Sequence, residues 1–226
     1  MKQDSTGDFD RKATLQALCR KMGARLASEV DTERTEAFRS GVGCVDELPS
    51  GGFPRNTVSE VMEPNPSSGG TFLLHQLLNQ VRVQRRYAAL VDGGDCFAPD
   101  SMPLETLRHL YWVRCRGTDE ALRVADLLAG DSNFSLLLID LRSSDASALR
   151  RVPGNRWYRL QRAVRKAACT CVALTAEPLI PSATLRLRLV GRFDLSALEQ
   201  TQALLAGQVS VEPLHAGHAG RIERFG

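Results

Sequence analysis

The sequence predicts an α/β domain built on a mainly parallel, twisted β-sheet with helices on both faces. Short apolar segments suited to buried strands alternate along the chain with longer segments of helical periodicity. The pattern of apolar and polar residues changes near the C-terminus, where leucine and arginine alternate with a period of two over residues 185–189. We therefore expect antiparallel strands at the C-terminal edge of the sheet.

Residues 1–37 are predicted to form an N-terminal helix and a linker. Apolar residues recur at helical spacing between residues 9 and 30, and a polar stretch follows at 31–36. The stripe proposed for docking consists of Leu15, Leu18, Met22 and Leu26. Such a helix either packs on its own domain or binds in a groove of another chain.

Residues 38–226 form the second predicted domain, which opens with a turn-rich stretch at 40–54. Its strands are expected at residues 57–62, 87–92, 110–114, 134–140, 169–175, 185–189, 209–212 and 221–224. Its helices are expected around residues 73–81, 118–129 and 155–168.

Composition narrows the class of protein. A chain of 226 residues with 43% hydrophobic and 24% charged residues is typical of a globular protein with its own core. The six cysteines form no Cys-x-x-Cys pair and the first residues lack an apolar signal segment, which predicts a cytoplasmic location. The apolar runs are far shorter than the ~20 residues of a membrane helix. We expect no metal site and no membrane association.

The segment after the first long strand has the outline of a phosphate-binding loop. The pattern G-x-x-x-x-G-K-[ST] supplies glycine backbone, a lysine for the β/γ-phosphates and a hydroxyl for magnesium. The sequence keeps Ser67, Ser68, Gly69 and Thr71. Gly70 occupies the lysine position, and Glu63 or Pro64 stands at the first glycine. Because proline lacks an N–H and glutamate repels phosphate, the loop is predicted to be degenerate.

Charge is distributed unevenly, although the net charge is only +3. Residues 142–166 contain eight basic residues and one acid. The candidate surface for a partner or for DNA consists of Arg150, Arg151, Arg156, Arg159, Arg162, Arg165 and Lys166. The alternative is a solvated helix face whose arginines pair with acids elsewhere in the fold.

The order of these pieces resembles the core of the RecA recombinase family over residues 38–225. The resemblance is carried by residues 41–48, 51–55 and 59–61, the degenerate loop, and the strands that end at Asp92 and Asp140. The turn at 51–55 and the strand at 185–189 are similar to ImuA-type proteins, the RecA-like partners of a mutagenic Y-family polymerase homologue in bacterial damage tolerance.

The resemblance implies a role for individual residues. The phosphate lysine corresponds to Gly70, and the acid that positions the attacking water corresponds to Gly94. Asp140 matches the magnesium-side aspartate, or it is a strand-end residue that caps the next turn. Glu177 falls where the family has an amide that senses the γ-phosphate. The two DNA-binding loops are expected to be shortened, and residues 209–215 lack the family's trans-acting lysines.

These losses favour a non-catalytic RecA-like adaptor in bacterial DNA-damage tolerance, in SOS mutagenesis and translesion synthesis, with no ATPase activity and no cofactor. The resemblance implies a Y-family polymerase-like partner, a replicative polymerase variant as a further partner, and weak or indirect contact with DNA. Two alternatives stay open. One is a weak nucleotide-binding ATPase that uses an arginine from elsewhere, and the other is a DNA-binding module that uses the basic face at 142–166.

Overall fold

The computed structural model describes residues 37–214, and a seven-stranded sheet runs through this part of the chain. In spatial order its strands are β5 (Leu110–Arg114), β4 (Tyr87–Asp92), β6 (Phe134–Asp140), β7 (Thr170–Thr175), β3 (Val58–Met62), β8 (Leu185–Leu189) and β9 (Val211–Leu214). All neighbouring pairs are parallel except β8 and β9. The predicted α/β fold with a mainly parallel sheet is confirmed.

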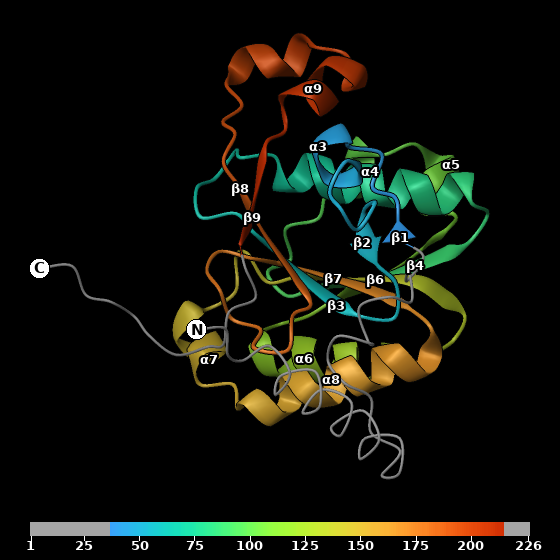
Figure 1. Cartoon of the computed structure of the whole chain (residues 1–226), viewed down its shortest axis with the longest axis vertical. Helices are drawn as coiled ribbons and strands as arrows, with labels where there is room; N and C mark the ends of the chain where they lie inside the picture. The colour runs from blue at the N-terminus through green and yellow to red at the C-terminus, as the bar shows by residue number, and fades with distance from the viewer. Residues whose placement is uncertain (1–36, 215–226) are drawn as a thin grey trace, which may run out of the picture. The chain divides into compact units, whose positions relative to one another are not determined.

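Helices interleave with these strands. They are α3 (Gly43–Asp46), α4 (Gly70–Val83), α5 (Leu104–Leu107), α6 (Thr118–Leu128), α7 (Ala146–Arg150), α8 (Gly154–Ala167) and α9 (Gln202–Gln208), with short 3₁₀ turns η1 (Pro99–Ser101) and η2 (Leu195–Glu199). Helices α4 and α5 lie on one face of the sheet, and α6 and α8 lie on the other (Figure 1). A small antiparallel pair, β1 (Ala37–Phe38) and β2 (Phe53–Pro54), precedes the main sheet.

The central strands are mostly apolar because their two faces enter two different cores. In β6, Leu136 and Leu138 belong to the cluster that contains the apolar stripe of α4. Leu137 and Ile139 belong to the cluster that contains the inner faces of α6 and α8. The continuous apolar runs of the sequence therefore arise because the sheet is buried on both faces.

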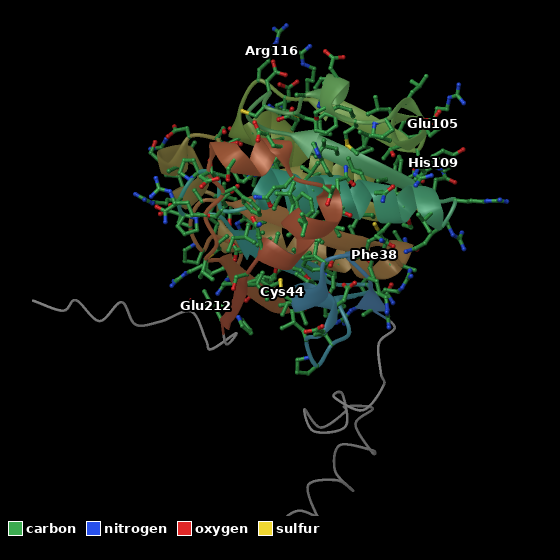
Figure 2. The ribbon with its side chains drawn as sticks, turned by 90° about the horizontal axis from the view of Figure 1, so that it is seen from above. Phe38, Cys44, Glu105, His109, Arg116 and Glu212 are labelled. Carbon is green, nitrogen blue, oxygen red and sulfur yellow. The ribbon has the colours of Figure 1, made fainter. Side chains whose placement is uncertain are left out.

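The C-terminal edge agrees with the prediction in outline and differs in detail. Strand β9 is antiparallel, but β8 runs parallel to β3 on its other side. The period of two in β8 reflects burial of Leu187 and Leu189, while Arg186 and Arg188 project from the opposite face. β9, which contains Pro213, is the edge strand. Arg116, just after β5, and Glu212, on β9, lie at opposite sides of the molecule (Figure 2).

The carboxyl ends of the parallel strands meet along one edge of the sheet. Met62 of β3 pairs with Thr175 of β7, and Asp140 of β6 pairs with both Leu174 and Asp92. The loops that follow these strands are thereby gathered in one place, which is where ligands bind in open α/β sheets. The stripe of Leu15, Leu18, Met22 and Leu26 and the expected strand at 221–224 lie outside the described residues.

Candidate functional site

The loop between β3 and α4 binds a carboxylate of its own chain, that of Glu63. Ser67 and Gly69 adopt positive φ angles of 65° and 104°, and α4 begins at Gly70. The backbone N–H groups of Ser68 and Gly70 both donate to the Oε1 atom of Glu63, each at 3.0 Å. The positive end of the helix dipole lies at the same point. The Glu63 carboxylate therefore takes up the backbone donors that a bound phosphate would use.

The second oxygen of Glu63 belongs to a buried ion-pair network. Glu63 Oε2 accepts from Arg142 Nη1 at 2.5 Å. The same guanidinium donates from Nε and Nη2 to the two carboxylate oxygens of Asp140, at 2.9 and 2.6 Å. Burial alone would lower the pKa of Arg142, but Asp140 and Glu63 outweigh that effect and raise the pKa above its ordinary value. Arg142 is thus a fixed cation between two carboxylates.

Gly70, at the predicted lysine position, faces this ion pair. A Cβ atom on Gly70 would collide with the Glu63 carboxylate and the Arg142 guanidinium. The hydroxyl of Thr71 accepts a hydrogen bond from Arg142 Nη1 at 3.3 Å. The space into which a lysine side chain would start is therefore filled, and the Thr71 hydroxyl is engaged by Arg142.

Asp140 satisfies the geometry of the second interpretation, a residue that caps the turn after its strand. Its Oδ1 atom accepts from the backbone N–H of Arg142 at 3.2 Å, in addition to the guanidinium contacts. Both of its carboxylate oxygens are thus occupied by one arginine. A magnesium ion at Asp140 would have to compete with this bidentate pair.

The acids of the turn after β4 are engaged by the backbone of that turn and by side chains of β5. A Cβ atom on Gly94 would lie 2.7 Å from Cβ of Ser143, so the turn packs closely there. Asp92 accepts from the backbone N–H groups of Cys96 and Phe97 at 3.0 and 2.9 Å. The neighbouring Asp95 forms an exposed pair with Arg114, whose Nε and Nη2 donate at 2.5 and 2.6 Å.

A cavity of about 920 Å³ lies beside the closed loop. Four of the predicted loop residues line it, namely Pro64, Ser67, Gly69 and Thr71. Ser68 and Gly70 are buried, with their N–H groups on Glu63. Glu63 and Arg142 border the same cavity, together with Phe72 and Phe193. The structure therefore brings the predicted loop residues together around an open space.

The short loop after β7 is fixed by a residue that the sequence did not single out. Glu60 of β3 is fully buried, and its Oε1 atom accepts from the backbone N–H groups of Leu179 and Ile180 at 2.7 and 3.2 Å. Its Oε2 atom accepts from Arg186 Nε at 2.7 Å. An acid inside an apolar strand was the signal in the sequence, since buried charges require partners.

The predicted basic surface is partly neutralised and partly exposed. Arg150 pairs with Glu177 through two hydrogen bonds of 2.6 and 2.7 Å. Arg156 pairs with Asp119 and Arg159 with Asp126. Arg151 contacts the hydroxyl of Ser147. On α8 the exposed basic residues also include Arg162, Arg165 and Lys166. The expected pairing with acids thus holds for Arg150, Arg156 and Arg159, and the use of the exposed residues as a surface for a partner or for DNA stays a prediction.

The aromatic residues of α8 and β5 also differ in their exposure and contacts. Trp157 is buried with Leu160 and Val164 against the core, whereas Tyr158 is about half exposed. Trp112 donates from its indole nitrogen to Asp92 at 3.2 Å. Tyr158 is therefore the aromatic side chain of α8 that is available to a partner.

Other kinds of site were sought within residues 37–214. No group of three or more His, Cys, Asp or Glu side chains in that range could hold a metal ion. The five cysteines there are free thiols. No helix among the described residues is long and apolar enough to cross a membrane.

Fold and geometry together define an α/β domain whose anion-binding loop is closed by its own carboxylate. No protein-family model matches the chain. No curated protein matches it in sequence.

Proposed function

We propose that the chain is a non-catalytic RecA-like accessory protein that acts in bacterial DNA-damage tolerance by binding a Y-family polymerase-like partner. The observation that supports the non-catalytic part is the Glu63 carboxylate on the backbone donors of the loop. A nucleotide phosphate needs the same donors and the same cation, Arg142. It would have to expel a buried, paired carboxylate in order to bind.

The RecA-like part of the proposal rests on the sequence resemblance. The mainly parallel sheet with an antiparallel last strand is compatible with that resemblance. The similarity of the sequence to ImuA-type proteins is the reason for proposing a Y-family polymerase-like protein as the partner. A replicative polymerase variant is the second proposed partner. The exposed Arg162, Arg165 and Lys166 of α8 support contact with an acidic surface of that partner. The resemblance, with its shortened DNA loops, supplies the further proposal that contact with DNA is weak or indirect.

A weak nucleotide-binding ATPase is the second candidate, and one contact favours it. Arg142 Nη1 lies 3.3 Å from the Thr71 hydroxyl. Its positive charge is therefore close to the loop and could replace that of the missing lysine. In this alternative Glu63 moves out of the loop when a phosphate enters, and Arg142 neutralises the phosphate charge.

ATP turnover by the purified full chain separates the two candidates. We expect no hydrolysis above background, with or without single-stranded DNA, because both the phosphate lysine and the water-positioning acid are absent from the sequence. Each such contact is worth ~10²–10³ in rate. Turnover that Asp140→Ala abolishes would establish the ATPase instead. The partner assignment is tested separately by mixing the chain with a purified Y-family polymerase homologue, and failure to form a complex would contradict it.

A further inference from the structure

We propose that the cavity beside the loop is a docking pocket for an aromatic side chain that a partner protein presents next to an acidic residue. The inference rests on the proposed function for the partner, a Y-family polymerase-like protein. It deepens that function by naming the surface that holds the partner and the chemistry that this surface recognises. The cavity measures about 920 Å³, which is within the size range of pockets that bind small organic groups.

The polar groups at the base of the cavity are occupied by one another. Glu63 accepts from the backbone N–H groups of Ser68 and Gly70, and its other oxygen accepts from Arg142. The same guanidinium also donates to both carboxylate oxygens of Asp140. Because these hydrogen bonds are already made, a polyanion would have to break them in order to bind. The walls of the cavity therefore decide what it accepts.

Those walls are largely apolar and come from two parts of the chain, the loop with the first turn of α4 and the connection from β8 to β9. The apolar residues that form them are Pro64, Pro66, Phe72, Phe193, Ala197 and Leu205. The rings of Phe72 and Phe193 form a tilted pair with centroids 6.4 Å apart, and both are only partly buried. Covering such rings with a further aromatic group removes much apolar surface from water.

The wall that contains Phe193 is held in place by contacts with the loop and with α4. The backbone N–H of Phe193 donates to the carbonyl oxygen of Ser67 at 2.8 Å, and its ring packs closely against Gly69. Gln76 of α4 donates to the side chain of Gln202 of α9 at 3.5 Å. The connection thus carries α9 to the side of the sheet where α3 and α4 lie (Figure 1). The pocket is formed before a partner binds, which lowers the cost of binding.

One cation at the rim of the cavity is available to a ligand. Arg192 is exposed, borders the cavity and forms no ion pair with an acid among residues 37–214. Asp194 borders the cavity as well, but its carboxylate accepts from the N–H and the hydroxyl of Ser196 at 3.0 and 2.5 Å and caps η2. A ligand with a carboxylate beside its aromatic group therefore complements this rim.

The test begins with small probes and the full chain. Indole-3-acetate combines an aromatic group with a carboxylate, indole lacks the charge, and tryptamine reverses it. Binding is measured by saturation-transfer NMR titration. We expect indole-3-acetate to bind with a dissociation constant of about 1 mM, which is reasonable for a ligand of its size. Indole should bind more weakly and tryptamine most weakly. ATP at the same concentration should not displace indole-3-acetate.

Two neighbouring leucines of α9 provide a matched pair of variants. Leu205 lines the cavity, whereas Leu204 is 60% exposed and lies outside the lining. Leu205→Ser should weaken the binding of indole-3-acetate by about fivefold or more, and Leu204→Ser should leave it unchanged. Arg192→Gln should remove the preference for indole-3-acetate over indole. Thermal melts of all three variants show whether they are folded.

The same proteins are then mixed with a purified Y-family polymerase homologue. Leu205→Ser and Arg192→Gln should each weaken the complex by about fivefold or more, whereas Leu204→Ser should not. An excess of indole-3-acetate should compete with the homologue for the native chain. This competition requires no variant, so it tests the pocket even if Leu205→Ser fails to fold.

The inference is overturned if no probe binds the native chain, if the Leu204 and Leu205 variants bind indole-3-acetate equally well, or if ATP displaces the probe. A complex that withstands saturating indole-3-acetate also overturns it. Probes that bind as expected, together with a homologue that forms no complex with any of the chains, would support the pocket and contradict the partner named in the proposed function.

Discussion

Glu60 lies in β3 and Glu63 directly follows that strand, and their carboxylates are satisfied in the same way. Each accepts two backbone N–H groups from a following loop and one arginine from another strand or its end. Buried carboxylates are tolerated only with such partners, and removing one member of a buried pair typically costs about 3–5 kcal/mol. These two acids therefore fix the loops after β3 and β7, both of which contribute residues to the lining of the cavity.

The closed loop predicts the behaviour of a lysine restored by mutation. Gly70→Lys alone should confer no nucleotide binding, because its side chain must start where the Glu63–Arg142 pair lies. Overpacking at this point should lower the free energy of unfolding by about 1–3 kcal/mol. Urea unfolding measures the loss of stability, and titration calorimetry with ATP measures binding.

Thr71→Ser, which keeps the hydroxyl of the same loop, is the matched control and should unfold like the native chain. Micromolar ATP binding by Gly70→Lys would contradict the prediction. It would mean that the Glu63 carboxylate leaves the loop readily.

At the scale of single elements, α8 shows how one helix serves two purposes. Its inner face packs Trp157, Leu160 and Val164 into the core. Its outer face carries arginines that differ in their partners, since Arg156 and Arg159 are paired with acids of α6. The paired residues attach α8 to its neighbour, and the charge of the remaining ones is directed to solvent.

Charge reversal on α8 should therefore affect association and not folding. We expect Arg162→Glu combined with Arg165→Glu to slow complex formation with the polymerase homologue and to weaken its dependence on salt. The melting midpoint should change little, since exposed charges contribute little to stability. Stopped-flow association at several salt concentrations measures the first effect, and thermal melts measure the second.

Arg156→Glu combined with Arg159→Glu provides the comparison, because it places acids beside Asp119 and Asp126 and should lower stability. Unchanged association in the Arg162 and Arg165 variant, together with lost DNA affinity, would favour the DNA-binding module instead. DNA affinity of that kind should fall steeply with added salt.

The elements differ in how well the sequence predicts them. Strands β4 and β6 are continuous apolar runs, and burial on both faces makes such runs easy to recognise. The direction of β8 is not encoded in its period of two, because alternation reports which face is buried and carries no information on the neighbouring strand.

The candidate site was predictable only in part, for a similar reason. The missing lysine at Gly70 is visible in the loop itself. The closing contact joins Glu63 to Arg142, 79 positions apart, and sequence spacing alone does not connect them. Arg142 was counted as one charge of the basic stretch, whereas the fold turns it inward to Asp140.

At the scale of the whole molecule, residues 37–214 contain two extensive apolar clusters of their own. Removing residues 1–36 should therefore leave the domain folded, with a melting midpoint within a few degrees of the full chain, about the effect of 1 kcal/mol. Capture of the polymerase homologue should weaken, because the stripe of Leu15, Leu18, Met22 and Leu26 is expected to bind it. Melts and pull-downs of both proteins measure these effects. An unfolded truncated chain would show that the N-terminal segment is structural.

The outermost strand of the sheet also bears on aggregation. An open sheet exposes unpaired donors and acceptors at its edges, and these invite foreign strands to pair. Pro213 removes one donor from β9, and the exposed Glu212 beside it adds charge, so the ladder cannot extend regularly there. At β5, the other outer strand of the described sheet, the exposed Arg114 adds charge and opposes the pairing of a foreign strand in the same way.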